Sequence, residues 1–132
     1  MQIALIAQDD KKELMAQLCI AYSSVLSQHK LCATAATGRL VSEASGLTIE
    51  YLFGGDVGGV DQIASRIAYG EIDVLFFFRS SDPNALLSDK VANLIQLCDT
   101  YNLPLATNLA TAEAIIMALG RGDLDWRENM HR

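Results

Sequence analysis

The chain has 132 residues, of which 51% are hydrophobic and 20% charged, and its formal net charge is −6. This composition is typical of one globular domain that is long enough to bury a hydrophobic core. Nucleic-acid surfaces need clustered lysines and arginines, so the acidic balance and scattered basic residues argue against such a partner. A small phosphate ester remains compatible, because backbone amides can bind it.

The chain shows neither a membrane-spanning pattern nor a secretory signal. No apolar run approaches the ~20 residues that a membrane helix requires. The apolar run at residues 3–7 is too short for a signal peptide, and no basic segment precedes it. We therefore expect a cytoplasmic protein with no membrane partner.

The cysteines and histidines do not form a recognisable metal or disulfide pattern. Cys19, Cys32 and Cys98 contain no C-x-x-C pair, and each lies in an apolar stretch. We expect them to be reduced, buried thiols. His29 and His131 have no ligand partner at metal-binding spacing. We therefore expect no metal site and no cofactor.

Short apolar runs alternate with longer helical patterns along the chain. The five expected strands are 3–7, 31–33, 47–52, 72–78 and 103–106. The run 72–78 is almost continuously apolar, which is typical of the central strand of a parallel sheet. The run 47–52 alternates between apolar and polar residues, so it is expected near an edge.

Helical periodicity fills the segments between these runs. The helical patterns extend from residue 10 to about 30, after Thr37 to Gly46, after Gly59 to Gly70, after a polar loop at 79–89 to Tyr101, and from 111 to about 119. The polar tail, residues 120–132, is expected to be loosely held.

This alternation predicts a doubly wound α/β fold: one domain, residues 1–132, with a five-stranded parallel sheet and helices on both faces. In such folds ligands bind beyond the carboxyl ends of the strands. That rule selects five loops as candidate ligand-binding segments. They are residues 8–12, 34–38, 54–62, 79–84 and 107–111.

Several of these loops carry residues suited to an anion. Gly58 and Gly59, expected just ahead of a helix, would let backbone amides approach a phosphate. Such glycines can equally serve tight packing. Thr34 and Thr37 are either hydroxyl donors or helix caps. Lys12 would ordinarily be a surface lysine, but it follows the carboxyl end of a predicted strand.

Four aspartates lie on the same predicted rim: Asp9, Asp56, Asp61 and Asp82. Converging carboxylates suggest proton chemistry, because a general base must lie within hydrogen-bond reach of its carbon acid. Two of the four have simpler explanations. Asp82 precedes a proline, as is common at the start of a turn, and Asp61 could cap a helix.

Six segments of the chain carry recognisable motifs. They are residues 3–9 together with Lys12, 32–38, 58–62, 72–77, 103–108 and 110–113. In this order they resemble the motifs of the methylglyoxal synthases. The first resembles that family's strand followed by His-Asp and a lysine. The second resembles its Tyr-Ala-Thr-Gly-Thr-Thr-Gly loop, and the third is similar to its Gly-Gly-Asp-Gln-Gln segment.

The resemblance implies a methylglyoxal-synthase-like fold and a carbon–oxygen lyase. Such an enzyme removes a proton from dihydroxyacetone phosphate and eliminates inorganic phosphate from the enediolate, leaving methylglyoxal. It also implies a small phosphorylated metabolite as partner and a homo-oligomer, a hexamer in that family. The same fold serves as a regulatory ligand-binding domain in carbamoyl phosphate synthetases.

Carried over to this chain, the resemblance implies a set of site residues. Asp61 would be the catalytic base, and Asp9 and Asp82 would position or polarise the substrate. The implied substrate- and phosphate-binding residues are Gln8, Lys12, Thr34, Thr37, Gly38, Gly54, Gly58 and Gly59.

The sequence departs from the family pattern at positions that the resemblance implies are catalytic. Gln8 replaces the histidine of the His-Asp pair, and the segment 80–89 has no counterpart of the active-site histidine. Val60 aligns with the catalytic aspartate unless the loop carries one extra residue, in which case Asp61 takes that place. Because losing one oxyanion donor costs ~10²–10³ in rate, binding should survive these changes better than turnover. The alternatives are a lyase or isomerase acting on another small substrate, and a non-catalytic domain that binds a phosphometabolite.

Overall fold

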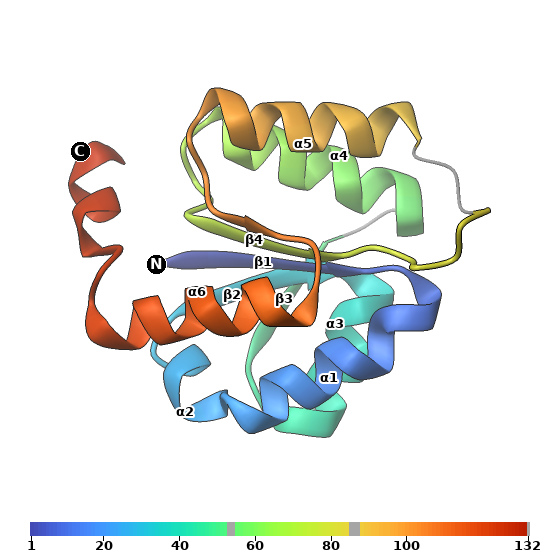
Figure 1. Cartoon of the computed structure of the whole chain (residues 1–132), viewed down its shortest axis with the longest axis horizontal. Coiled ribbons are helices and arrows are strands. Elements are labelled where there is room, and N and C mark those ends of the chain that lie inside the picture. The colour runs from blue at the N-terminus through green and yellow to red at the C-terminus, as the bar shows by residue number, and fades with distance from the viewer. Residues whose placement is uncertain (53–54, 85–87, 132) are drawn as a thin grey trace.

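Five parallel strands form the sheet in the part of the chain that the computed structural model describes, residues 1–52, 55–84 and 88–131 (Figure 1). Their order across the sheet is β3-β2-β1-β4-β5. The strands are β1 Gln2–Ala7, β2 Lys30–Thr34, β3 Ile49–Leu52, β4 Val74–Phe78 and β5 Leu105–Ala106. The predicted doubly wound α/β class is therefore confirmed.

The central strand is β1, not the run 72–78 that its apolarity favoured. β1 pairs with β2 on one side and with β4 on the other, and Ala7 lies in register with Phe78. Apolarity could not decide between them because both strands are buried almost throughout. The order is set by the crossovers: after β3 at the edge, the chain returns to the far side of β1. β1 and β4 thus flank the point where the strand order reverses, which is where such sheets bind ligands.

Helices cover both faces of the sheet (Figure 1). On one face lie α1, α2, α3 and α6, and on the other lie α4 and α5. The bounds are α1 Lys12–Ala21, α2 Ser23–Leu26, α3 Ala35–Ser45, α4 Gly55–Ala68, α5 Asp89–Thr100 and α6 Leu109–Arg121. Short 3-10 helices occupy η1 Asp9–Lys11 and η2 Asp125–His131.

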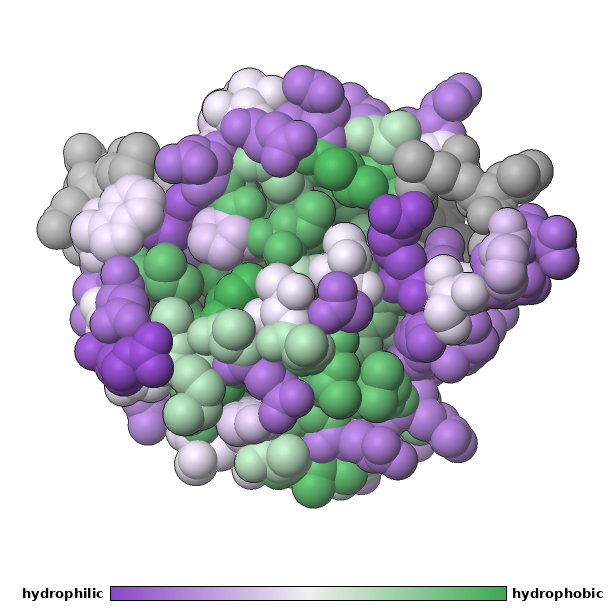
Figure 2. Space-filling view, in the orientation of Figure 1, coloured by the Kyte–Doolittle hydropathy of each residue, from purple (hydrophilic) through white to green (hydrophobic). Residues whose placement is uncertain are grey.

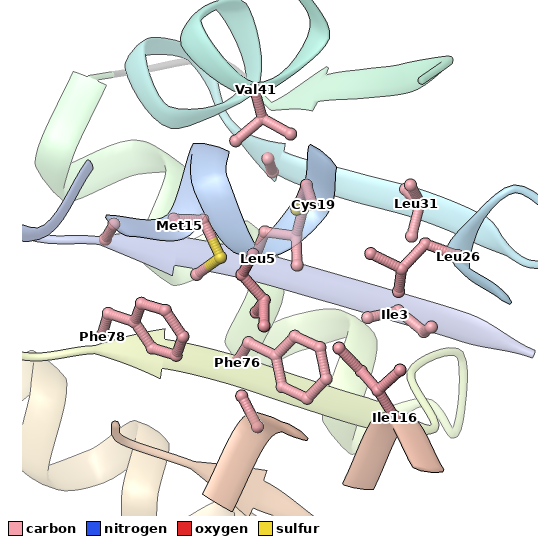
Figure 3. Close-up of a cluster of buried hydrophobic side chains, with 14 of the residues drawn as sticks. Ile3, Leu5, Met15, Cys19, Leu26, Leu31, Val41, Phe76, Phe78 and Ile116 are labelled. Carbon is pink, nitrogen blue, oxygen red and sulfur yellow. The ribbon is translucent and has the colours of Figure 1, made fainter. Parts of the chain in front are cut away.

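Alternate residues of the strands enter two separate hydrophobic clusters. Phe76 and Phe78 pack with Leu5 and Met15 on the α1 side, as Figure 3 shows. Phe77 faces the α4 and α5 side. A strand buried on both faces must be apolar at every position, which explains the continuous runs in the sequence. The three cysteines are buried and free, as predicted.

Two of the predicted helices have different boundaries. The pattern from residue 10 to about 30 divides into η1, α1 and α2, because the chain leaves helical geometry at Tyr22 (φ −115°, ψ 26°). The Tyr22 hydroxyl donates a hydrogen bond to Glu113 of α6 at 2.6 Å, so this break is held by tertiary contact. The helix predicted after Gly59 begins earlier, at Gly55.

The tail predicted to be loosely held is packed against the amino end of the sheet. η2 places Arg127 in the interior, where it is 3% exposed. Its Nη1 donates to the carbonyl oxygen of Asn102 at 2.7 Å. The prediction was wrong because a polar composition does not reveal that a single arginine has buried partners.

The exposed surface is mixed in character. Figure 2 shows hydrophilic residues around the rim of one face, with apolar residues gathered nearer its centre. The large hydrophobic side chains that are exposed are Ile20, Tyr51, Tyr69, Tyr101, Met117 and Trp126. Among the described residues, no helix combines the length and hydropathy that crossing a membrane requires.

Candidate functional site

A cavity of about 640 Å³ opens beyond the carboxyl ends of β1, β2 and β4. Its walls have two characters. Ile6, Val60, Phe77 and Val91 form the apolar part, with Ala7 beside them. The polar lining residues are Gln8, Asp9, Asp10, Lys12, Thr34, Ser80, Asp82, Ser88 and Lys90. Four of the five loops selected by the strand-end rule therefore meet at one site, and residues 107–111 do not line it.

Lys12 provides a largely enclosed positive charge in this cavity. Its side chain is 17% exposed, and its Nζ lies 2.5 Å from Oδ1 of Asp9 and 3.2 Å from the carbonyl oxygen of Ala7. The turn η1 brings Asp9 beside it. The hydrogen bond from Lys12 lowers the pKa of the Asp9 carboxyl. An ammonium group has three N–H donors, so one remains without a partner among the described residues.

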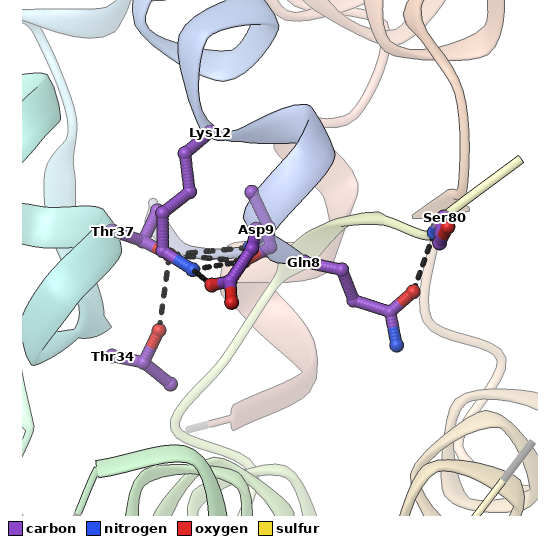
Figure 4. A network of polar contacts seen from close by, with 7 residues as sticks. Gln8, Asp9, Lys12, Thr34, Thr37 and Ser80 are labelled. Carbon is purple, nitrogen blue, oxygen red and sulfur yellow. Dashed lines mark hydrogen bonds and ion pairs between the residues drawn. The ribbon is translucent and has the colours of Figure 1, made fainter. Parts of the chain in front are cut away.

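Thr34 and Thr37 connect the ends of β1 and β2. Thr37 is fully buried, and its Oγ1 accepts from the amide of Ala7 at 3.2 Å and from Oγ1 of Thr34 at 3.2 Å. Thr34 occupies the N-cap position of α3, but its side chain makes no capping hydrogen bond. Of the two, only Thr34 lines the cavity, and Figure 4 shows the hydrogen bond between the two side chains. A direct contact between Thr37 and a ligand stays a prediction.

The glycines have packing roles in this region. Gly58 and Gly59 lie inside α4 and not ahead of its N-terminus, which corrects the sequence prediction. A Cβ on Gly59 would lie 2.7 Å from Cγ2 of Thr34, so its absence lets α4 approach the end of β2. A Cβ on Gly38 would lie 2.8 Å from the ring of Tyr51. Gly54 and the side chain of Asp56 lie outside the described residues.

The loop after β4 is tied to the loop after β1. The amide of Ser80 donates to Oε1 of Gln8 (Figure 4). Oγ of Ser80 donates to Oδ2 of Asp10 at 2.9 Å. Oδ1 of Asp82 accepts from the amide of Asn84 at 2.9 Å, so Asp82 does have the expected turn role while also lining the cavity.

Asp61 is placed differently from the other predicted site residues. It lies in the interior of α4, so it is not a helix cap. Its carboxylate is 57% exposed, bonds Lys90 at 2.6 Å and does not line the cavity. The preceding Val60, 7% exposed, lines the cavity instead. One residue rotates a side chain by about 100° around a helix. Catalysis by Asp61 stays a prediction.

Four polar lining residues were not named as site residues from the sequence: Asp10, Ser80, Ser88 and Lys90. The first two lie in loops that the strand-end rule selected, and the other two lie outside all five loops. Ser88 caps α5 by accepting from the amide of Val91 at 3.2 Å. No local sequence pattern predicted that the amino end of α5 would lie against the cavity. In the described part of the chain, no group of three or more His, Cys, Asp or Glu side chains could hold a metal.

Comparison with known proteins identifies relatives along almost the whole chain. No family model matches. The chain is 53% identical to a methylglyoxal synthase of Caldicellulosiruptor saccharolyticus over 128 residues, which cover 97% of this chain and 91% of that relative. It is 48% identical to a methylglyoxal synthase of Oceanobacillus iheyensis, with the same coverage. With a methylglyoxal synthase of Listeria innocua it shares 45% identity, over 97% of this chain and 96% of that one.

A solved structure agrees with these relatives. The crystal structure of methylglyoxal synthase from Elizabethkingia anophelis NUHP1 matches with a TM-score of 0.80 and 34% sequence identity, covering 87% of this chain and 76% of that chain. The resemblance inferred from the sequence motifs is thereby confirmed. The chain belongs to the methylglyoxal synthase family, whose members are enzymes of the phosphate-eliminating lyase type.

Proposed function

We propose that this chain eliminates phosphate from dihydroxyacetone phosphate, or from a closely related small phosphorylated ketone, in the cavity beyond β1, β2 and β4. The observation that carries the proposal is Lys12, an enclosed ammonium group in the cavity with an uncommitted donor. A phosphate dianion is well matched to this ammonium group, because hydrogen bonds from a charged donor are stronger than neutral ones.

The reaction also needs a base, and the cavity contains three carboxylates. Asp9 is bonded to Lys12, and its pKa is lowered, so it suits a fixed acceptor for a substrate hydroxyl better than a proton carrier. Asp10 and Asp82 each have one oxygen that no described residue bonds. We assign proton abstraction to one of these two. Asp61, the base implied by the family motif, instead holds Lys90 at the rim.

The chemical steps balance without a cofactor. The base takes a proton from the hydroxymethyl carbon, and the electron pair moves onto the carbonyl oxygen to form an enediolate. The enediolate electrons then form a carbon–carbon double bond to the phosphate-bearing carbon while the hydroxyl proton shifts to the former carbonyl oxygen, and phosphate leaves with the electron pair of the carbon–oxygen bond that breaks. The resulting enol takes up a proton at its CH2 carbon and loses its hydroxyl proton, which gives methylglyoxal.

One observation favours a second candidate, phosphometabolite binding without turnover. Among the described side chains of α4, Val60 lines the cavity, and it can neither take nor give a proton. Lys12 would still bind a phosphate in that case.

The test is an assay with dihydroxyacetone phosphate that follows methylglyoxal and inorganic phosphate together. We expect the two products in equal amounts, and a loss of roughly 10²–10⁴ in kcat in either Asp10→Asn or Asp82→Asn. Asp99→Asn, an exposed position on α5, is the matched control and should keep full activity. A comparable loss of kcat in Asp61→Asn alone would show instead that Asp61 is the base. No turnover, with a Tm that still rises on adding phosphate, would establish the second candidate.

We also propose that the chain is a single domain that assembles as a homohexamer in the cytoplasm. The assembly is supported by the resemblance of the chain to the methylglyoxal synthases, for which the resemblance implies a hexamer. Light scattering coupled to size-exclusion chromatography tests the assembly directly. A monomer across the micromolar range would contradict it.

A further inference from the structure

A second, smaller cavity of about 280 Å³ adjoins the first. Its walls come from the turn η1, from the loop after β4 and from the loop after β5, residues 107–111. The loop after β5 does not line the first cavity, so the proposed reaction gives it no role. The polar residues that line the second cavity are Lys11, Arg79, Ser80, Ser81, Thr107 and Asn108.

The two cavities are separate sites that share one wall. Ser80 is the one described residue that lines both. Its amide donates to Gln8 and its hydroxyl donates to Asp10, and both of these partners line the first cavity. The turn η1 also divides two consecutive lysines, because Lys12 lines the first cavity and Lys11 lines the second. The second cavity therefore has donors of its own.

The charge of the second cavity is positive. Neither Lys11 nor Arg79 forms an ion pair or a side-chain hydrogen bond with any described residue. The described residues that line this cavity include no carboxylate. Most other basic side chains in the described part of the chain are paired with an acid. The paired residues are Lys12, Arg66, Lys90, Arg121 and Arg127. In a chain with a net charge of −6, a concave surface with two unpaired cations attracts anions selectively.

The rest of the wall is apolar. Leu14, Phe78 and Leu109 line the same cavity, beside the two cations. An inorganic anion would leave these side chains facing water, whereas a hydrocarbon group would cover them and be stabilised by burial. The guanidinium group of Arg79 offers paired donors that match the two oxygens of a carboxylate. The lining is therefore suited to a molecule that has both a carboxylate and a hydrocarbon part.

We infer that the second cavity binds a small organic acid. Arg79 and Lys11 pair with its carboxylate groups, and its hydrocarbon part contacts Phe78. The hydroxyl groups of Ser81 and Thr107 are further donors, since no described residue accepts a hydrogen bond from either. A volume of about 280 Å³ is below the range that holds drug-sized ligands, so the acid has only a few carbon atoms. This inference does not depend on the proposed reaction, which uses other residues.

The experiment measures the Kd of succinate by calorimetry at constant ionic strength. Arg79→Met and Lys11→Met each remove one unpaired cation and retain a long side chain. We expect each substitution to raise the Kd roughly three- to tenfold, because partly exposed ion pairs with ligands lie between surface pairs and enclosed charge-assisted hydrogen bonds. Lys30→Met is the matched control: Lys30 is exposed, has no ion pair with a described residue and does not line this cavity. It should leave the Kd unchanged.

Inorganic phosphate distinguishes the two cavities. We expect Lys12→Met to weaken phosphate but not succinate, and Arg79→Met to weaken succinate but not phosphate. Phosphate at saturation should not displace succinate. Displacement would place succinate in the first cavity and overturn the inference. An equal loss of succinate affinity in Lys30→Met would also overturn it, because the effect would then come from net charge alone.

The chemical class of the ligand is tested with neutral and inorganic probes. Succinamide, which lacks the charges, should not bind measurably. A second equivalent of phosphate that Arg79→Met abolishes, together with no binding of succinate, would show that the cavity holds inorganic anions and would overturn the assignment of an organic acid. Absence of binding by succinate, glutarate and butyrate at millimolar concentration would overturn the inference as well. Loss of turnover with dihydroxyacetone phosphate would contradict the proposed function but leave this result unchanged.

Discussion

The two ends of β1 carry polar groups that are satisfied in different ways. At the amino end, the amide of Gln2 donates to Oδ2 of Asp73 at 2.9 Å, and Nε of Arg127 lies 4.0 Å from Oδ1 of the same carboxylate. Asp73 is 5% exposed and Arg127 3%. At the carboxyl end, Lys12 and Gln8 line an open cavity of about 640 Å³ and keep uncommitted donors.

The difference arises from what covers each end of the same sheet. The segment η2 folds over the amino end and brings Arg127 to Asp73. At the carboxyl end, the loops after β1, β2 and β4 surround the cavity without filling it. Buried charges need partners, and at the amino end these partners come from the protein itself. At the carboxyl end, Lys12 and Gln8 keep donors that no described residue uses, so they are available to a ligand. Mutations at the amino end should therefore change stability, and those at the carboxyl end should change binding.

The largest expected effect is at the amino end. Arg127→Met removes the buried guanidinium group, which lies beside the carboxylate of Asp73 and donates to the carbonyl oxygen of Asn102. We expect the free energy of unfolding to fall by about 3 kcal/mol or more, the usual result of breaking a buried pair. Urea denaturation measures it. Arg121→Met is the control, because Arg121 is 62% exposed and pairs with Asp123 at the surface. It should cost less than about 1 kcal/mol. Equal losses of unfolding free energy in the two variants would contradict the structural role that we assign to the amino end of β1.

At the carboxyl end, Lys12→Met should act on binding. We expect the Kd for inorganic phosphate to rise about 10- to 100-fold, because a charge-assisted hydrogen bond is lost. Lys11→Met changes the neighbouring charge, which does not line this cavity, and should leave the Kd unchanged. Calorimetry measures both variants.

A second readout of Lys12→Met is independent of any ligand. Lys12 lowers the pKa of Asp9, so removing it should move that pKa upward, towards the ordinary value. The Asp9 carboxyl would then become protonated at a higher pH than in the unmodified protein. Carbon NMR titration follows this change. An unchanged Asp9 titration would mean that the ion pair does not persist in solution.

A smaller effect is expected at the close approach of α4 to β2. Gly59→Ala adds a Cβ 2.7 Å from Cγ2 of Thr34. Overpacking of this kind costs about 1–3 kcal/mol, which exceeds the gain of up to about 1 kcal/mol from replacing glycine inside a helix. We expect a net loss of about 1 kcal/mol in urea denaturation. In a Thr34→Ser background, which lacks Cγ2, the same change should cost less. A loss of the same size in both backgrounds would contradict the contact.

The smallest expected effect is at the cysteines, which belong to neither end. Burial raises the pKa of Cys19 to about 12 and the pKa of Cys32 and Cys98 to about 11. In the native protein at pH 8 we expect no reaction with a thiol reagent, and in denaturant three equivalents. Stability should fall above about pH 9, because unfolded thiols ionise there before folded ones do. Rapid labelling of native protein would contradict this burial.

Much of the fold could be predicted from the sequence. The five strands were found because buried strands are short apolar runs, and the doubly wound class follows from their alternation with helical patterns. Edge placement was correct for 47–52, which contains the edge strand β3. The order of the strands was not predictable in the same way: β1 and β4 are equally apolar, and only the path of the crossovers separates them.

The candidate site was predictable to the level of loops but not of side chains. The strand-end rule brought Lys12, Thr34 and Asp82 to one cavity. It could not decide between Val60 and Asp61, because that choice depends on where α4 begins and on its rotation over the sheet. Nor could it show that Ser80 would orient Gln8, because the two residues are 72 positions apart in the chain.

The sequence by itself determined the parallel sheet, the buried thiols, the family motifs and the end of the sheet where ligands bind, because these depend on local patterns of apolar and polar residues. The tertiary structure alone decided which donors remain uncommitted. Nη1 of Arg127 has a partner because η2 folds back to the carbonyl oxygen of Asn102, and the amide of Gln8 is oriented because the loop after β4 reaches it. Whether a polar group stabilises the fold or binds a ligand depends on partners that are remote in sequence, and packing alone brings those together.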